Sequence, residues 1–312
     1  FAGGLLVSNS HCGKHFRSRR TVASHRVAQA IPVVWGGTAT PIPDRVRDLW
    51  GQLYAVGGRG AWGTSLGFCK HYCHAVPGQF GGFSTDGPHR EGCARCERTS
   101  AELRSRLAWW TDRRTRAAIA HMLPPATYAM VHVSPSDDAS EEDAPGRSRS
   151  SVEAAIAYAA ARKLKPAAVR AAEALVSGEK IAVVGNRRAW VPRMAAAIVK
   201  ALPASWHRPG GPKLWLRQAT GEDDVTARQA LAAEFMRVAV GPREEYRAAA
   251  LVATDASIRT SIDLHAADRV LIVALPWTPE ALEQLIGRFR RLGGVSVQYD
   301  LFIGVGTIDD AI

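Results

Sequence analysis

The chain has 312 residues, which is enough for about two domains with separate hydrophobic cores. Its 40 Lys and Arg against 29 Asp and Glu give a formal charge of +11, which favours an anionic partner, nucleic acid first. Five cysteines are too few for a disulfide scaffold, and neither a run of about 18 apolar residues nor a secretory leader is visible, so we expect a cytoplasmic protein without a membrane partner.

The first 133 residues are predicted to contain two regions. Residues 1–50 have the character of the end of an α/β domain, with strands at Leu5-Leu6-Val7 and Val33-Val34-Trp35 around a basic helical stretch. Residues 51–133 are predicted to be a mostly helical and irregular insert. An amphipathic helix is expected over Leu103–Met122. Because the chain begins at Phe1 rather than Met, we expect a further segment of the first domain upstream.

The remainder is predicted to be a flexible acidic linker, residues 134–150, followed by a second α/β domain, residues 151–312. The linker has almost no large apolar side chains with which to repay its ordering entropy. Helical and strand patterns then alternate, which indicates a mostly parallel sheet with helices on both faces. The predicted helices are Val152–Val176, Val191–Leu202 and Val225–Val238, and the predicted strands are Lys180–Gly185, Ala249–Thr254, Arg269–Leu275 and Val297–Ile303.

The run from Gln284 to Gly294 stands out because it places Arg288 and Arg291 three residues apart on a predicted short helix. A guanidinium is permanently charged and matches phosphate oxygens bidentately. Two such groups after a buried strand are what a nucleotide-dependent motor needs to contact a γ-phosphate. The alternative is a solvated basic helix.

Several segments, in chain order, resemble helicase motifs. Thr38–Arg45 with Arg47–Trp50 is similar to motif III, Leu107–Arg116 with Leu123–Pro125 to the segment before the second lobe, Gly178–Ile181 to motif IV, Val252–Asp268 to motif V, Gln284–Gly293 to motif VI, and Gly306–Asp309 to a closing tail. Together they resemble superfamily 2 helicases and translocases of the Snf/Swi type, which are DNA-stimulated ATPases with two RecA-like lobes. The resemblance implies an α/β fold: the end of RecA-like lobe one, a helical insert, and RecA-like lobe two.

The resemblance also implies the cofactors ATP and Mg²⁺ and a nucleic-acid partner, DNA in the first place. By this similarity Arg288 and Arg291 would complete the ATP site from the second lobe, and Gln284 would orient nearby groups. The other nucleotide-site residues implied are His11, Thr38, Thr40 and Gly287. The hydroxyls of Thr254, Ser257, Thr260 and Ser261 would bind DNA phosphates, although ordinary turn hydrogen bonds explain such hydroxyls equally well.

The chain departs from the family at its catalytic positions. It contains no G-x-x-x-x-G-K-[ST] loop, and Ser8 and Asn9 stand where the Asp and Glu of the Walker B motif belong. Neither side chain can act as a carboxylate base, and Mg²⁺ is usually bound through carboxylates. In motif V the glycines are missing and Asp263 replaces an Asn, which adds negative charge near the DNA path; Arg290 and Gly294 replace a His and a Gln of motif VI. Whether the chain is part of an active motor or a nucleic-acid-binding protein with impaired chemistry is therefore left open.

Four cysteines have a spacing that resembles a zinc site: Cys69, Cys73, Cys93 and Cys96. Four thiolates in two short-range pairs suit tetrahedral Zn²⁺, and His71, His74 and His89 are additional candidates. Such an ion would have a structural role, because four thiolate ligands leave no open coordination position for catalysis. The alternatives are a metal-free insert and, for function, a zinc-stapled structural or interaction subunit.

Overall fold

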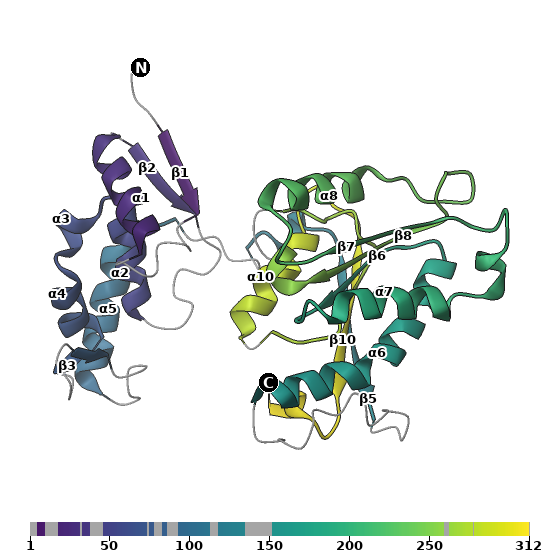
Figure 1. Ribbon diagram of the computed structural model, residues 1–312. Helices are drawn as coiled ribbons and strands as arrows, with labels where there is room; N and C mark the ends of the chain where they lie inside the picture. Colours follow the sequence, from purple (N-terminus) through teal and green to yellow (C-terminus); the bar gives the residue numbers. More distant parts are fainter. Residues whose placement is uncertain are drawn as a thin grey trace. The chain divides into compact units, whose positions relative to one another are not determined.

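The computed structural model describes residues 5–9, 18–31, 33–37, 46–73, 75–77, 83–85, 93–112, 118–134, 152–258, 262–276 and 278–311 (Figure 1). The chain divides into two compact units, Phe1–Arg114 and Thr115–Ile312, and each is described by itself. None of the described helices is long and apolar enough to cross a membrane.

The first unit begins with a strand–helix–strand segment. Strands β1 (Leu5–Asn9) and β2 (Val33–Gly37) are parallel, with Ser8 opposite Gly36 and Asn9 opposite Gly37. Helix α1 (Arg19–Ala30) connects them, and the Ser18 hydroxyl accepts a hydrogen bond from the Thr21 N–H at its start. The two predicted strands and the basic helix are therefore present.

The rest of the first unit is mostly helical. Its elements are α2 (Val46–Ala55), α3 (Arg59–Trp62), α4 (Ser65–Tyr72), α5 (Ala94–Ala108) and a short antiparallel pair, β3 (Ala75–Pro77) with β4 (Phe83–Thr85). Side chains of α2, α3, α4 and α5, among them Trp50, Phe68 and Leu103, form its hydrophobic core. The predicted helix Leu103–Met122 is wrong in its bounds, because α5 ends at Ala108 and a 3₁₀ turn, η2 (Ala120–Met122), follows.

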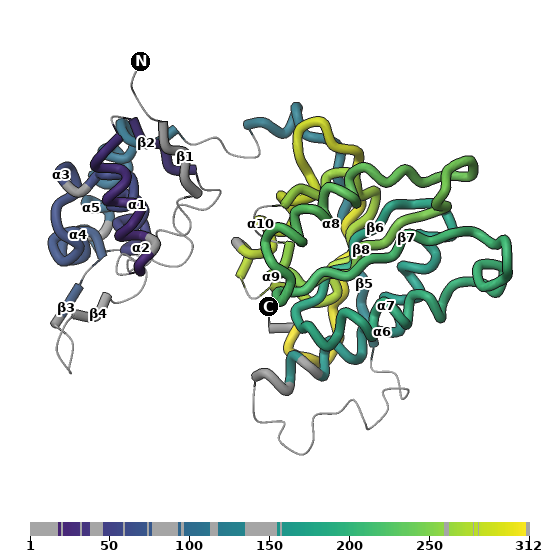
Figure 2. Tube along the Cα trace, turned by 45° about the horizontal axis from the view of Figure 1, so that its top comes forward, coloured from purple at the N-terminus to yellow at the C-terminus, as the bar shows by residue number. Residues whose placement is uncertain are grey.

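The second unit is built on a six-stranded parallel sheet of order β5-β10-β9-β6-β8-β7 (Figures 1 and 2). Its strands are β5 (Ala126–Val133), β6 (Lys180–Gly185), β7 (Leu214–Ala219), β8 (Ala248–Thr254), β9 (Arg269–Ile272) and β10 (Val297–Gly304). Its helical elements are α6 (Val152–Val176), α7 (Trp190–Ala201), η4 (Ala204–His207), α8 (Val225–Arg237), α9 (Asp255–Ile258), α10 (Pro279–Phe289) and η5 (Ile308–Ala311).

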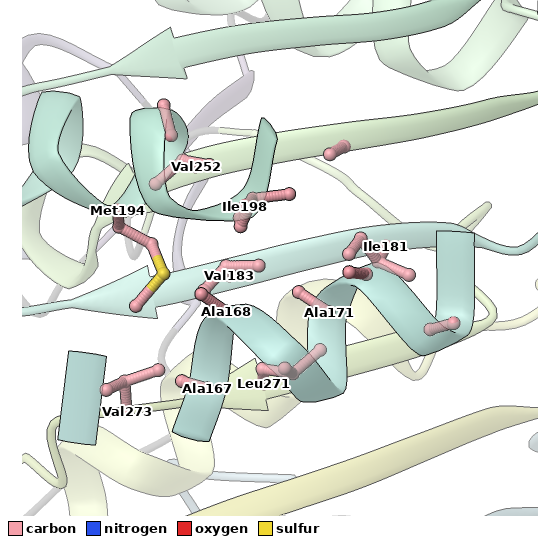
Figure 3. Close-up of a cluster of buried hydrophobic side chains, with 14 of the residues drawn as sticks. Ala167, Ala168, Ala171, Ile181, Val183, Met194, Ile198, Val252, Leu271 and Val273 are labelled. Carbon is pink, nitrogen blue, oxygen red and sulfur yellow. The ribbon is translucent and has the colours of Figure 1, made fainter. Parts of the chain in front are cut away.

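Successive side chains of the central strands point to opposite faces, and a separate helical layer covers each face. Ile181 and Val183 of β6 lie in a cluster with α6 and α7, in which Ala167, Ala168 and Ala171 let α6 approach the sheet closely (Figure 3). The other cluster lies beneath α8, α9 and α10 and contains Ala182 and Val184 of β6, Phe235 of α8, and Leu285 and Phe289 of α10. The predicted fold class, a parallel sheet with helices on both faces, is confirmed.

Strand β5 changes the predicted division of the chain. Residues 126–133 were expected in the helical insert, but β5 pairs along its whole length with β10, from Ala126 opposite Val297 to Val133 opposite Gly304. In the sequence, the boundary between the two units falls between Arg114 and Thr115 instead. The predicted linker, residues 134–150, lies almost wholly outside the described residues.

Candidate functional site

Helix α10 positions the two candidate arginines. Thr278 caps it by accepting a hydrogen bond from the Ala281 N–H, and Pro279 occupies its first turn, where its missing N–H costs nothing. Leu285 and Phe289 are fully buried against the sheet. The helix ends at Phe289 and its C-cap, Arg290, is extended, so Arg288 lies in the last turn and Arg291 just beyond it. The prediction that both arginines lie on one short helix is therefore wrong for Arg291, which follows the end of the helix.

Arg291 is nevertheless held close to the helix by two interactions. Its Nε donates a hydrogen bond to the Gly287 carbonyl at 3.1 Å. Its Nη1 lies 2.7 Å from Oδ1 of Asp263 in an ion pair whose side chains are 38% and 49% exposed. Asp263, which the resemblance to motif V places near the DNA path, is therefore the counterion of Arg291.

Arg288 has a more buried guanidinium environment. Desolvation lowers the pKa of Arg288, the neighbouring charge of Arg291 lowers it further, and Asp263 opposes both effects. An arginine keeps its proton through such a shift. Two guanidiniums within electrostatic reach, one of them partly dehydrated, form a site with strong attraction for a multivalent anion.

The segment after β8 packs directly against the end of α10. The Leu264 N–H donates to the Arg288 carbonyl at 2.9 Å, and the Val295 N–H donates to the His265 carbonyl at 3.2 Å. The structure therefore brings the segments that resemble motifs V and VI together. Gln284 and Gly287, the other candidates on α10, are half-buried on the same helix.

The four candidate hydroxyls differ in what they do. Ser257 is fully buried, and its hydroxyl lies 2.7 Å from the Thr254 carbonyl oxygen, a local turn contact, and 3.2 Å from the carbonyl oxygen of Ala219 at the end of β7. Thr254 is also buried, but its Oγ1 has no hydrogen-bond partner among the described residues. A buried hydroxyl without a partner is costly and calls for an explanation. Thr260 and Ser261 lie outside the described residues.

Of the first-unit candidates only backbone positions are described. Ser8 and Asn9 end β1, and β2 ends opposite them at Gly36 and Gly37. Since β1 and β2 are parallel, their last residues, Asn9 and Gly37, lie at the same edge of the pair. His11, Thr38 and Thr40 lie outside the described residues.

The structure pairs two of the four candidate zinc ligands. Cys69 and Cys73 are buried in the core of the first unit, and a hydrogen bond between their side chains lowers the pKa of Cys69 and raises that of Cys73. Cys93 precedes α5, and the side chain of Cys96 is not described. The described residues contain no group of three or more His, Cys, Asp or Glu side chains that could hold a metal ion.

The additional histidine candidates do not complete a metal-binding group among the described residues. His71 Nε2 lies 2.8 Å from Oε2 of Glu102, whose other oxygen accepts a hydrogen bond from the Tyr72 hydroxyl, and His74 and His89 lie outside the described residues. The zinc site stays a prediction, which elemental analysis of the purified chain checks.

Two contacts of the candidate site were not anticipated from the sequence. Arg290 Nε donates to the Pro124 carbonyl at 2.9 Å and ties the end of α10 to the segment that leads into β5. Arg228 of α8 donates from Nη1 to the Ser257 carbonyl at 3.2 Å. Neither pairing has a sequence signal, because the partners are far apart along the chain and the acceptors are backbone atoms.

Part of the second unit matches a known family of domains. Residues 219–293, from the last residue of β7 through the arginine pair, match the family described as "Helicase conserved C-terminal domain". A crystal structure of the C-terminal part of the Fun30 ATPase domain is similar at 16% identity and a TM-score of 0.34, over 44% of this chain and 39% of that one. The chain thus covers well under half of that protein's chain, and no curated protein matches it. With its six-stranded parallel sheet, the second unit has the RecA-like fold of a helicase C-terminal lobe.

Proposed function

We propose that this chain is part of an ATP-dependent nucleic-acid translocase or helicase of the Snf/Swi type, with Arg288 and Arg291 supplying positive charge to the transferring phosphate. The observation that carries the proposal is the joining of Arg288, Arg291 and the segment after β8 into one cluster, within the residues that match a helicase C-terminal domain.

The chemistry of phosphoryl transfer suits such a pair. The reaction depends mainly on positioning and on charge stabilisation, and an arginine finger contributes about 10³–10⁵ in rate. A guanidinium supplied by a second lobe acts only when the lobes close on the nucleotide. Hydrolysis would thereby be coupled to a change in lobe arrangement, and, on a bound strand, to movement.

Nucleic-acid contact is proposed at the end of β8. Thr254 Oγ1, which has no hydrogen-bond partner among the described residues, is a donor that a phosphate oxygen would satisfy. The chain's charge of +11 favours a polyanion. Such contacts position the protein without reading base sequence. DNA is the partner proposed first, with Thr260 and Ser261 as further donors.

The residues of this chain fit ATP better than they fit its metal. The arginine pair matches a phosphate chain, whereas Ser8 and Asn9 offer no carboxylate to Mg²⁺. Bound Mg²⁺ would neutralise charge on the β- and γ-phosphates. The substitutions at Ser8 and Asn9 favour a second candidate function, a nucleic-acid-binding protein that keeps the helicase fold without hydrolysis.

DNA-stimulated ATP hydrolysis by the full-length protein tests the proposal. We expect Arg291→Ala to lower the DNA-stimulated kcat by about 10³-fold or more, because the substitution removes the positive charge that stabilises the transferring phosphate. The matched control is Arg243→Ala, which removes an exposed arginine elsewhere on the second unit and should leave the rate unchanged.

Two other results would decide against the motor. Equal rates for Arg291→Ala and the unmodified protein would remove the arginine pair from the chemistry. Absence of hydrolysis in the unmodified protein, together with DNA binding that weakens steeply with salt, would establish the binding function instead.

A further inference from the structure

We propose that Asp263 gates the arginine pair: its carboxylate holds Arg291 in an internal ion pair, and phosphate can bind Arg291 only by displacing that carboxylate. This inference rests on the proposed function, in which Arg291 acts on a phosphate. It assigns to Asp263 the role of a positioning residue that competes with the nucleotide.

The residues on both sides of Asp263 are anchored in the hydrophobic core. Its neighbours Ile262 and Leu264 are buried, at 7% and 0% exposure. The Leu264 N–H is bonded to the Arg288 carbonyl, which ties this segment to the end of α10. Asp263 itself is half-exposed and projects to Arg291, with 2.7 Å between Oδ1 and Nη1.

The charges around Asp263 show why it sits there. Arg288 and Arg291 repel each other, since the charge of Arg291 lowers the pKa of Arg288 while that of Asp263 raises it. One carboxylate therefore neutralises part of a like-charged pair. A phosphate group carries more negative charge than a carboxylate and has three acceptor oxygens. It can therefore neutralise the two arginines in place of Asp263 and displace Asp263 from Arg291.

The exposure of the pair makes it displaceable. Ion pairs at this degree of exposure are weak, because water and salt screen them. The second bond of Arg291, from Nε to the Gly287 carbonyl, does not involve Asp263, so the side chain stays near α10 when the ion pair opens. The arrangement is that of a gate that sets a threshold for the anion, rather than a permanent block.

The first test measures how accessible the Arg291 guanidinium is, without any nucleotide. The full chain is treated with phenylglyoxal, and modification at Arg291 is followed by peptide mass spectrometry. We expect Asp263→Asn, which keeps the shape and removes the charge, to speed modification of Arg291 about two- to fivefold. Asp263→Glu restores a carboxylate and should bring the rate back toward that of the unmodified chain.

The matched control is Glu245→Gln, which removes the same charge from another exposed ion pair of this unit, with Lys213. Arg291 in this variant should react with phenylglyoxal at the same rate as in the chain without a substitution. Unchanged labelling in Asp263→Asn, or equal acceleration in Glu245→Gln, would overturn the proposal. Equal thermal unfolding midpoints for the variants show that the labelling reports on the ion pair and not on unfolding.

The second test uses inorganic tripolyphosphate as the probe, with affinity measured by calorimetry. We expect Asp263→Asn to bind it about two- to fivefold more tightly than the unmodified chain and Glu245→Gln to match the unmodified chain. Affinity that is equal in Asp263→Asn and the unmodified chain overturns the gate. If labelling and affinity change as expected while the full-length protein hydrolyses no ATP in any variant, the proposed motor function fails and the gated anion site stands.

Discussion

At the scale of single residues, two buried charges of the second unit are stabilised only by specific partners. Lys163 of α6 is 1% exposed, and its Nζ lies 2.6 Å from Oδ2 of Asp309 in η5. The same carboxylate oxygen accepts the Gly304 N–H at 2.8 Å. Burial lowers the pKa of Lys163, and Asp309 opposes that shift. The pair joins α6 to the residues that follow β10, where the sequence resembles the closing tail of a helicase lobe.

Lys163→Ala is predicted to destabilise the second unit by about 3–5 kcal/mol, because it leaves Asp309 as a buried charge without its counterion. Urea unfolding followed by circular dichroism measures the change. Lys200→Ala, at an exposed position in α7, should stay within about 0.5 kcal/mol of the unmodified chain.

The double variant Lys163→Met with Asp309→Leu extends this prediction, because replacing both charges by apolar groups should restore most of the stability. A single Lys163→Ala change that leaves the unfolding midpoint where it was would show that the ion pair contributes nothing.

At the scale of elements, the sequence predicted best where apolar runs are long and uninterrupted. Strand β6 has the predicted bounds and α6 has the predicted length, because every residue of β6 is buried and α6 is a continuous alanine-rich stretch. Strand β5 was missed because it is an edge strand with exposed Tyr128 and Met130, so its pattern lacks a buried run. The end of α5 was missed because Trp109 and Trp110 continue the apolar pattern although both are exposed.

In the candidate site, too, the contacts at the ends of helices and strands could not be predicted from the sequence. The arginine pair was singled out by residue type and spacing together with the resemblance of the run to helicase motif VI. The ion pair with Asp263 was not, because it depends on where the segment after β8 returns to α10. The bonds of Ser257 to the Thr254 and Ala219 carbonyls, and the lack of a hydrogen-bond partner for Thr254 Oγ1 among the described residues, likewise depend on contacts that spacing does not encode.

At the scale of the whole molecule, the chain consists of two units whose boundary lies at Arg114 and Thr115. The second unit includes β5, although residues 135–150 stand between β5 and α6 outside the described part of the chain. Tyr128 of β5 stacks on Tyr299 of β10, with ring centroids 5.1 Å apart. The sheet is therefore completed by a strand that comes before the predicted linker.

A fragment of residues 115–312 is accordingly predicted to unfold cooperatively, whereas a fragment of residues 151–312 should be less stable and prone to aggregate. Removal of β5 uncovers the pairing edge of β10, and an uncovered hydrophobic edge recruits other strands. Urea midpoints and size-exclusion profiles of the two fragments measure this. Equal midpoints and monomeric behaviour for both would place β5 outside the folding unit.

Recognition of the transferring phosphate of ATP by Arg291 is measured with a transition-state analogue. In the DNA-bound full-length protein, the affinities for ADP alone and for ADP with aluminium fluoride are compared before and after Arg291→Ala. We predict a loss of about 10³-fold in affinity for the aluminium fluoride complex and no change for ADP, because the guanidinium acts on the group in transfer. Equal losses for both ligands, or no loss for either, would show that Arg291 does not act on the transferring phosphate.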